Sequence, residues 1–171
     1  MDSYFEEYIK NYPDFPKKGI NFKDIMPIFA EPEVFSKSLE KMSNFDFCKD
    51  AEAIIAVDAR GFLFGAGLSL KLSKPLITAR KPGKLPGEVF TKSYDLEYGS
   101  NSLSIQRESL EKFSSFVIVD DLLATGGTVK CISDIVNSQI KEITGLTVLI
   151  ELKDLNGRSK LNFPVESQLI F

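Results

Sequence analysis

The sequence predicts a single α/β domain with three layers and a central, mostly parallel sheet. Four short apolar runs are rich in β-branched residues and nearly continuous, as expected of parallel strands that are buried on both faces. They span residues 53–57, 75–79, 116–119 and 146–152. Helix-like segments follow the first and third runs, at 61–72 and 128–139. Helices that alternate with strands cover both faces of one sheet, and a chain of 171 residues suffices for one such core.

Two further helices are predicted before the first strand. Ser3 and Glu6 have the spacing of a capping box, and apolar residues follow at helical spacing, so we expect an amphipathic helix that Pro13 ends. Pro32 suits the first position of a second helix, because its missing N–H costs nothing there. Apolar residues recur at helical spacing over 35–42, which supports this second helix.

Charge and composition limit the partners of the protein. The 21 basic and 24 acidic residues give a net charge of -3, so there is no overall attraction to nucleic acid or membrane, and any anion site has to be local. The start of the chain, MDSYFEEYIK, lacks the features of a secretory signal, and no apolar run reaches the roughly 18 residues of a spanning helix. We therefore expect a soluble, cytoplasmic protein that binds neither nucleic acid nor membrane.

The chain contains no histidine. This excludes Ser-His-Asp and Cys-His catalysis and histidine-ligated metals, and it leaves carboxylates, Lys, Tyr and Cys for proton transfer. Cys48 and Cys131 lie far apart without a C-x-x-C pair, so reduced structural thiols are expected rather than a disulfide or a zinc site.

The stretch VIVDDLLATGGT, at 117–128, places two carboxylates beside a loop suited to an anion. An apolar run ends at Asp120 and Asp121, and TGGT opens the next predicted helix, so the motif should lie at the carboxyl edge of the sheet, where α/β proteins bind ligands. Backbone N–H groups at a helix N-terminus and two threonine hydroxyls can bind a phosphate there. The loop is neither a Walker loop nor a dinucleotide fingerprint. Its residues are Ala124, Thr125, Gly126, Gly127 and Thr128.

The adjacent carboxylates have a use if the ligand is a sugar phosphate. The 124–128 loop would hold the phosphate, while Asp120 and Asp121 accept hydrogen bonds from the neighbouring sugar hydroxyls. Each piece alone is also typical of an ordinary turn and helix start. The combination of strand, turn and helix favours a binding site.

Residues 80–102 do not fit the alternation of strands and helices. The segment RKPGKLPGEVFTKSYDLEYGSNS has two turn signals, several lysines and little periodicity. Long loops in compact domains are usually functional or disordered, so we predict a mobile lid or binding loop. The alternative is a solvated excursion or a hairpin.

Four blocks of the sequence resemble the type I phosphoribosyltransferases, and in particular the adenine phosphoribosyltransferases. They are PDFPKKGINFKDI at 13–25, VDARGFLFG at 57–65, RKPGKLPGEV with SYDLEYG within 80–99, and VIVDDLLATGGT at 117–128. The last block is similar to the family motif that binds phosphoribosyl diphosphate (PRPP). The resemblance implies one phosphoribosyltransferase domain over 1–171, with a small N-terminal hood that recognises the base at 1–30 and a flexible lid loop at 80–102.

The resemblance also implies an activity, a cofactor and an assembly. The family transfers ribose 5-phosphate from PRPP to N9 of adenine, which releases diphosphate and makes AMP in purine salvage. Adenine and PRPP would then be the substrates, and Mg²⁺ would accompany the PRPP without an assigned protein ligand. A homodimer is expected from the family alone.

Family roles carry over to matching positions of this chain. Residues 124–128 would bind the 5-phosphate, and Asp120 and Asp121 would face the ribose hydroxyls. The diphosphate would be bound by Ala59, Arg60, Arg80, Lys81 and Lys84, and Arg60 would also be catalytic. Glu97 would act catalytically at purine N7, and Tyr98 would help to close or position the lid. Two carboxylates near Glu97 could compete for its role, namely Glu88 and Asp95.

The resemblance places the base on the hood. Adenine would stack on Phe22, and the backbone beside it would read the Watson–Crick edge. Two positions depart from the family pattern: Asn21 stands where relatives usually carry an apolar residue, and Lys23 where many carry arginine. If both positions act through their backbones the changes are tolerable, and if they act through their side chains the base preference is open.

Two other functions are compatible with parts of this pattern. A phosphoribosyltransferase for another purine base would share the PRPP site and differ in the hood. A non-catalytic regulator that senses PRPP or nucleotides would usually carry a basic DNA-binding helix. The N-terminal segment instead has Glu6, Glu7 and only Lys10, which argues against the regulator.

Overall fold

The computed structural model describes residues 3–95 and 100–171. Within these residues, none of the helices combines the length and the apolar character needed to cross a membrane. In chain order the 3-10 helices (η), α-helices and strands are η1 (Ser3–Tyr8), β1 (Lys10–Pro13), β2 (Asn21–Asp24), α1 (Met26–Ala30), α2 (Pro32–Ser43), α3 (Asp46–Asp50), β3 (Ala53–Val57), α4 (Gly61–Leu72), β4 (Leu76–Ala79), β5 (Val89–Asp95), β6 (Ser100–Gln106), α5 (Arg107–Glu111), β7 (Ser115–Leu123), α6 (Gly127–Ser138), β8 (Glu142–Glu151), η2 (Lys153–Leu155), η3 (Gly157–Lys160) and β9 (Val165–Ile170).

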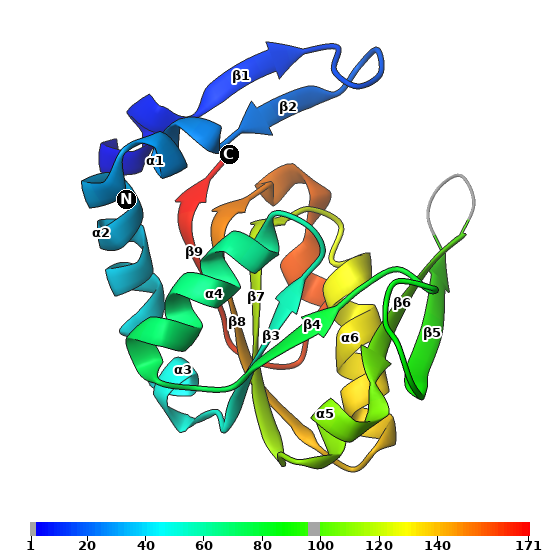
Figure 1. The fold of residues 1–171 in the computed structure, drawn as a ribbon. Helices are drawn as coiled ribbons and strands as arrows, with labels where there is room; N and C mark the ends of the chain where they lie inside the picture. The colour runs from blue at the N-terminus through cyan, green and yellow to red at the C-terminus, as the bar shows by residue number, and fades with distance from the viewer. Residues whose placement is uncertain (1–2, 96–99) are drawn as a thin grey trace.

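A five-stranded parallel sheet forms the centre of the molecule, with strand order β4-β3-β7-β8-β9 (Figure 1). Strand β3 is buried along its whole length, as its continuous apolar composition predicts. The four strands expected from the sequence are confirmed, although β7 and β8 extend beyond their apolar runs. Strand β9 was not predicted, because its exposed and half-buried positions interrupt the apolar pattern.

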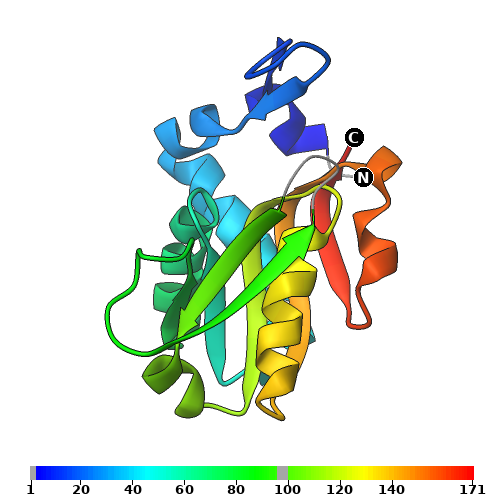
Figure 2. The same ribbon diagram turned by 90° about the vertical axis from the view of Figure 1, so that its right-hand side faces the viewer.

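Helices and a hairpin cover the two faces of the sheet and enclose two separate cores (Figures 1 and 2). Helices α2 and α4 pack on one face, over Ile54 and Val117. Helix α6 and the β5–β6 hairpin pack on the other face, over Ile55 and Ile118. Successive strand residues therefore serve opposite cores. The predicted three-layer fold is confirmed, and so are the helices expected to begin at residues 32 and 61.

The order of the strands reverses between β3 and β7. Strand β4 lies beyond β3, whereas β8 and β9 lie beyond β7. The chain leaves β3 for α4 on one face and leaves β7 for α6 on the other. Open α/β sheets bind ligands outside the carboxyl ends of the strands at such a reversal. The turns at 58–60 and 124–126 follow these two strands and frame the expected site.

The hood differs from its prediction. Only a 3-10 helix, η1, forms at the start, and the predicted helix up to residue 12 is wrong because β1 takes up 10–13. Proline disfavours the helical conformation of the residue before it, so Pro13 holds Tyr12 extended. Tyr12 then pairs with Phe22 in the antiparallel β1–β2 hairpin, which projects beyond the carboxyl ends of the sheet strands (Figure 1).

The segment at 80–102 contains two strands within the described residues. From residue 89 onward it enters an antiparallel hairpin, β5–β6, whose register runs from Val89 opposite Gln106 to Asp95 opposite Ser100. Residues 89–95 and 100–102 of the segment thus form the hairpin that was the alternative, and the lid role stays a prediction. Half-buried residues such as Phe90 pack on the core beneath α6, and this packing compensates for the weak periodicity of the sequence.

Helix α4 approaches β3 closely because residue 65 is glycine. A Cβ at Gly65 would lie 2.4 Å from Cβ of Ala56. We expect Gly65→Ala to lower the free energy of unfolding by about 1–3 kcal/mol through overpacking, measured by chemical denaturation. Ala66→Ser, at an exposed position of the same helix, is the control. An unchanged denaturation midpoint for Gly65→Ala would show that the helix moves away without cost.

Candidate active site

Asp120 and Asp121 lie near the carboxyl end of β7, against the turn that follows β3. Both are buried, with 9% and 6% of their surface exposed. Oδ1 of Asp120 accepts a hydrogen bond of 2.8 Å from the backbone N–H of Asp121. A Cβ at Gly61 would come within 2.7 Å of the same oxygen, so only glycine allows the turn to approach this closely. The two carboxylates lie inside β7 rather than after it, because the strand continues to Leu123.

Arg60 connects the sheet edge to the hood. Its Nη2 lies 2.7 Å from Oδ2 of Asp121, and its Nη1 donates a hydrogen bond of 3.3 Å to the backbone carbonyl of Lys23. The guanidinium carbon is 5.0 Å from the centre of the Phe22 ring. In the turn before Arg60, the peptide bond between Asp58 and Ala59 is cis. The turn after β3 thus brings the predicted cation next to the predicted carboxylates.

The adjacent carboxylates repel each other in a buried setting. Burial, and then the charge of Asp121, raise the pKa of Asp120 well above its ordinary value, while Arg60 opposes the shift. Oδ2 of Asp121 is buried and accepts no hydrogen bond within the described residues, so its contact with Arg60 is an ion pair only. The remaining lone pairs of this oxygen can accept hydrogen bonds from the hydroxyl groups of a ligand.

The 124–128 loop forms the N-terminal end of α6, close to its predicted place. Gly126, with φ of +77°, precedes the helix and provides no side-chain cap. The first N–H groups of α6 therefore keep their capacity for an anion, and the helix dipole favours negative charge there. A cavity of about 70 Å³ is lined by this loop together with Asp120. The anion loop and a carboxylate thus share one cavity.

A second loop supports the 124–128 loop from behind. A Cβ at Gly126 would lie 2.5 Å from the carbonyl oxygen of Gly157, and a Cβ at Gly157 would lie 2.1 Å from that of Ala124. Main chain therefore packs directly on main chain. The sequence analysis missed Gly157, although a glycine after Asn156, which has a left-handed conformation, is a turn signal.

A partly buried ion pair holds this supporting loop. Arg158 donates from Nε to Oε1 of Glu151 at 3.0 Å and from Nη2 to Oε2 at 2.6 Å. Ser167 donates to the same Glu151 oxygen at 2.9 Å, and Arg158 also donates to the carbonyl of Val165. The paired guanidinium holds the pKa of Glu151 below its ordinary value. The network fixes residue 157 at the end of β8, which in turn fixes the anion loop.

The predicted diphosphate residues are brought together only in part. Arg80 follows β4, and its Nε donates to Oδ2 of Asp58 at 2.9 Å, so its guanidinium lies at the same sheet edge as Arg60. Its Nη1 also donates to the carbonyl of Lys84 at 3.3 Å. Lys81 and Lys84 are exposed in the turn that follows. Ala59 lies in the turn after β3, next to Arg60.

Phe22 reaches the site from the hood, as predicted. Its ring is partly buried between the Arg60 guanidinium and the ring of Phe15, which meets it edge-on at 5.2 Å. Phe22 also lines an apolar cavity of about 250 Å³ with Tyr12, Phe15 and Asp24. This volume approaches the lower limit of roughly 300 Å³ for small-molecule sites, so a planar ring system is a suitable occupant.

The two unusual hood positions have different surroundings. The ammonium of Lys23 donates to Oδ1 of Asn11 at 2.7 Å and lies 3.8 Å from the centre of the Phe171 ring. Its side chain is thus held by these two neighbours, whereas its backbone carbonyl accepts the hydrogen bond from Arg60. Asn21 is exposed at the start of β2. This geometry favours a backbone role for Lys23.

The predicted catalytic Glu97 and the lid residue Tyr98 lie outside the described residues, so their roles stay predictions. Glu88, one of the competing carboxylates, lies just before β5 and is paired with Arg107 at 2.9 Å. The sequence analysis missed Tyr94, whose hydroxyl lies 3.1 Å from Oγ1 of Thr128. Periodicity in β5 was too weak to indicate which face Tyr94 occupies.

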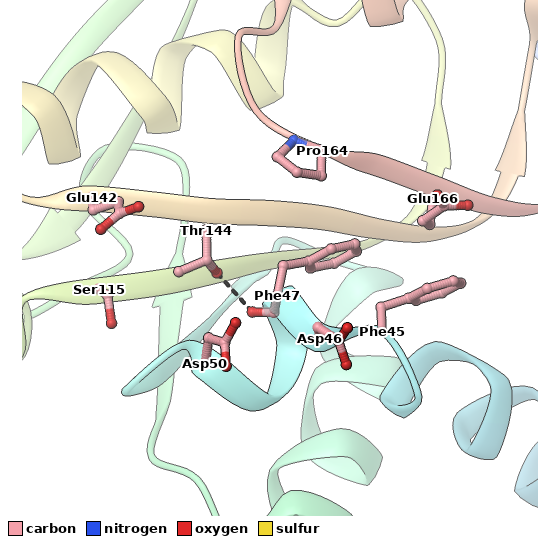
Figure 3. Close-up of a pocket in the computed structure, with 9 residues that line it drawn as sticks. All are labelled: Phe45, Asp46, Phe47, Asp50, Ser115, Glu142, Thr144, Pro164 and Glu166. Carbon is pink, nitrogen blue, oxygen red and sulfur yellow. Dashed lines mark hydrogen bonds between the residues drawn. The ribbon is translucent and has the colours of Figure 1, made fainter.

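Another cavity, of about 540 Å³, lies at the opposite edge of the sheet (Figure 3). It is formed by α3 and the amino-terminal ends of β7, β8 and β9. Its charged lining consists of four exposed carboxylates, from Asp46, Asp50, Glu142 and Glu166. These would repel a phosphate, so the smaller cavities at the carboxyl edge are the better candidates for an anionic ligand.

Comparison with known proteins shows the family of the chain. Residues 34–163 match the family model of the phosphoribosyl transferase domain, and the chain belongs to this family. An adenine phosphoribosyltransferase of Prochlorococcus marinus (strain MIT 9515) is 56% identical over 171 residues, which is 100% of both chains. The chain is thus a member of the adenine phosphoribosyltransferase branch.

Solved structures of that branch share the fold. The crystal structure of adenine phosphoribosyltransferase from Thermoanaerobacter pseudethanolicus has a TM-score of 0.93 at 42% identity, and the match covers 99% of each chain. The Saccharomyces cerevisiae enzyme, complexed with adenine and an imino-altritol bisphosphate, has a TM-score of 0.87 at 34% identity over 97% of each chain. The type I phosphoribosyltransferase fold expected from the sequence is confirmed.

The raised pKa of Asp120 leads to a stability prediction. A buried acid whose folded pKa exceeds its unfolded value destabilises the folded state as the pH rises above the unfolded pKa, here 3.8. We expect Asp120→Asn to increase the melting temperature at pH 7.5 by about 2–4 °C for each kcal/mol gained. The increase should shrink toward pH 4, because the wild-type carboxyl is then protonated. A lower melting temperature for the variant at neutral pH would contradict the assignment of a costly buried charge.

For the Glu151–Arg158 pair we expect the opposite dependence of stability on pH. Because the folded pKa of Glu151 is depressed, its contribution is present above the unfolded value of 4.5 and is lost as the pH falls through the folded pKa. Glu151→Gln should lower the free energy of unfolding by about 1–3 kcal/mol at pH 7, less than for a fully buried pair because the Arg158 side chain is 45% exposed.

The difference in free energy of unfolding between wild type and Glu151→Gln should therefore become smaller below about pH 4.5. Denaturation curves recorded over a pH series measure it. Glu108→Gln is the matched control, because Glu108 pairs with Lys112 at 2.8 Å on the exposed surface of α5, where solvent weakens the interaction. An equal loss of unfolding free energy in both variants would mean that the burial of Glu151 adds nothing to stability.

Proposed function

We propose that this chain catalyses the Mg²⁺-dependent transfer of ribose 5-phosphate from PRPP to N9 of adenine, forming AMP and diphosphate. The observation that carries the proposal is the shared cavity of the 124–128 loop and Asp120, at the reversal of strand order. Membership of the adenine phosphoribosyltransferase branch supports the same reaction.

PRPP presents two kinds of group to this cavity. Its 5-phosphate accepts hydrogen bonds from the first N–H groups of α6 and from the hydroxyls of Thr125 and Thr128, in the positive field of the helix N-terminus. Its ribose hydroxyls donate to Asp120 and Asp121. Oδ2 of Asp121 is buried and has only the ion pair with Arg60 among the described residues, so it keeps lone pairs that a sugar hydroxyl can use.

The diphosphate requires cations on the other side of the ribose. Arg60 and Arg80 follow neighbouring strands and lie at the same sheet edge, each paired with a carboxylate. In the proposed complex the diphosphate competes with Asp121 and Asp58 for these guanidiniums, and Ala59 contributes backbone from the turn. Lys81 and Lys84, both exposed, add longer-range attraction.

The carboxylates also assist the chemical step. As the bond from C1 of the ribose to diphosphate breaks, positive charge develops on the sugar ring. A fixed negative charge next to the ring stabilises that transition state more than the ground state, and this difference accelerates the reaction. Arg60 balances the charge that accumulates on the departing diphosphate.

Adenine would stack on Phe22 in the hood, with backbone groups of 21–23 reading its Watson–Crick edge. The neighbouring aromatic rings of the 250 Å³ hood cavity make the surroundings apolar, which favours a neutral planar base. Because the side chain of Lys23 is held by Asn11 and Phe171, the lysine in place of the family arginine leaves adenine selectivity intact. Asn21 likewise acts through its backbone.

The donor set fits a magnesium ion carried mainly by PRPP. Mg²⁺ prefers oxygen ligands and is usually bound through one or two carboxylates plus substrate phosphates, with waters completing its shell. The described residues contain no group of three carboxylates or thiols that could hold a metal by themselves. Asp120 and Asp121 are the residues that would contact a magnesium-bound substrate. When bound, the ion neutralises phosphate charge.

Proton transfer at the base falls to Glu97 in this proposal, and Tyr98 helps to position it. We expect Glu97→Gln to lower kcat by about 10²–10⁴-fold, the usual contribution of a positioned acid or base, while the KM for PRPP changes little. Steady-state kinetics with saturating adenine would measure both constants. Unchanged kcat would remove the role of Glu97 and direct attention to Asp95.

The deciding experiment offers PRPP and Mg²⁺ with adenine, hypoxanthine, guanine or xanthine separately and follows nucleotide and diphosphate by chromatography. Preferential formation of AMP supports the proposal. Nucleotide from another base alone would keep the PRPP site and overturn the role of the hood around Phe22. PRPP binding without any product would favour a regulator. A homodimer in the cytoplasm, expected for such an enzyme, is tested by sedimentation and by fractionation.

A further inference from the structure

We infer that Tyr94 is a positioning residue for the 5-phosphate: its hydroxyl donates to Thr128 and turns the Thr128 proton toward the phosphate. This inference rests on the proposed function. The hydroxyl of Tyr94 lies 3.1 Å from Oγ1 of Thr128, in the first turn of α6. Its ring lies beside the neighbouring residue, where a Cβ at Gly127 would be 3.1 Å from Cδ2 of Tyr94.

The position of Tyr94 is fixed by contacts farther along the same helix. The ammonium of Lys92 lies 3.0 Å from Oδ2 of Asp134, and the thiol of Cys131 donates to the Lys92 carbonyl at 3.2 Å. These two contacts attach β5 to α6 one to two turns beyond the anion loop. The hydroxyl of Tyr94 adds a contact at the start of the helix. Figure 2 shows the β5–β6 hairpin beside α6.

The direction of the hydrogen bond follows from the number of protons. A threonine hydroxyl has one proton to donate and two lone pairs, and so does a tyrosine hydroxyl, whereas an ionised phosphate ester offers acceptors. If Thr128 donated to Tyr94, it would have no proton for the phosphate. If Tyr94 donates to Thr128, both protons are used in a chain that ends on the phosphate. Hydrogen bonds in such a chain also strengthen one another.

This assignment gives the hydroxyl of Tyr94 and its ring different roles. The ring packs near Gly127 and on the core, which is a structural contribution that phenylalanine would keep. The hydroxyl contributes to binding of the 5-phosphate only through Thr128. Ligands that contain the 5-phosphate should therefore depend on it, whereas free diphosphate, which binds at the arginines, should not.

The test is a double-mutant cycle with AMP as the probe, measured by calorimetry on wild type, Tyr94→Phe, Thr128→Val and the double variant. We expect Tyr94→Phe to weaken AMP binding about three- to tenfold, the range of one neutral hydrogen bond. In the Thr128→Val background the same change should have no further effect. The Kd of diphosphate should stay within about twofold, and the KM for PRPP should rise while kcat is kept.

Ser93→Ala is the matched control, because it removes a hydroxyl from the adjacent residue, which contacts Ser102 at 2.9 Å. It should leave AMP binding unchanged. Full AMP affinity in Tyr94→Phe, an equal loss in the Thr128→Val background, or a parallel loss for diphosphate would each overturn the inference. Wild-type protein that binds neither AMP nor PRPP would instead overturn the proposed function, and the inference with it.

Discussion

The close contact between β7 and the turn after β3 is the constraint on which the site depends. Parallel pairing of β3 with β7 places the two turns side by side, and Gly61 allows the first turn to approach the Asp120 carboxylate. Arg60 then meets Asp121 and continues to the hood. Any side chain at position 61 would separate these groups, so one missing Cβ sets the spacing between the cation, the carboxylates and the base-binding segment.

This arrangement stores a cost in the unliganded protein. Two carboxylates are buried next to each other, and one oxygen accepts no hydrogen bond within the described part of the chain. Such a cost persists only where the rest of the fold can bear it, here through the surrounding buried strands and the two cores. In the proposed complex, the ribose hydroxyls would donate to these carboxylates and offset part of that cost.

The sequence was most informative where local pattern and tertiary role agree. The buried strands and the helices at 32–43 and 61–72 could be predicted because their apolar residues follow the period of the element. The start of the chain could not, since the aromatic residues at 4–12 have helical spacing while Pro13 makes the last of them extended. Asp120, Asp121 and the 124–128 loop were identifiable because a strand, a turn and a helix occur in one short motif. Tyr94, Gly157 and the Glu151–Arg158 pair come from distant segments, and no local pattern reveals that they meet at this loop.

The contact between the main chains at residues 126 and 157 has an evolutionary consequence. Because the anion loop is supported by peptide groups, most substitutions around it leave the supporting atoms unchanged. The shape of this loop is therefore insensitive to most substitutions, except at the two glycines. The hood differs, because its cavity is lined by the side chains of Tyr12, Phe15 and Phe22. If the proposed roles are right, selection can alter the choice of base while the part of the site that binds the sugar phosphate stays constant.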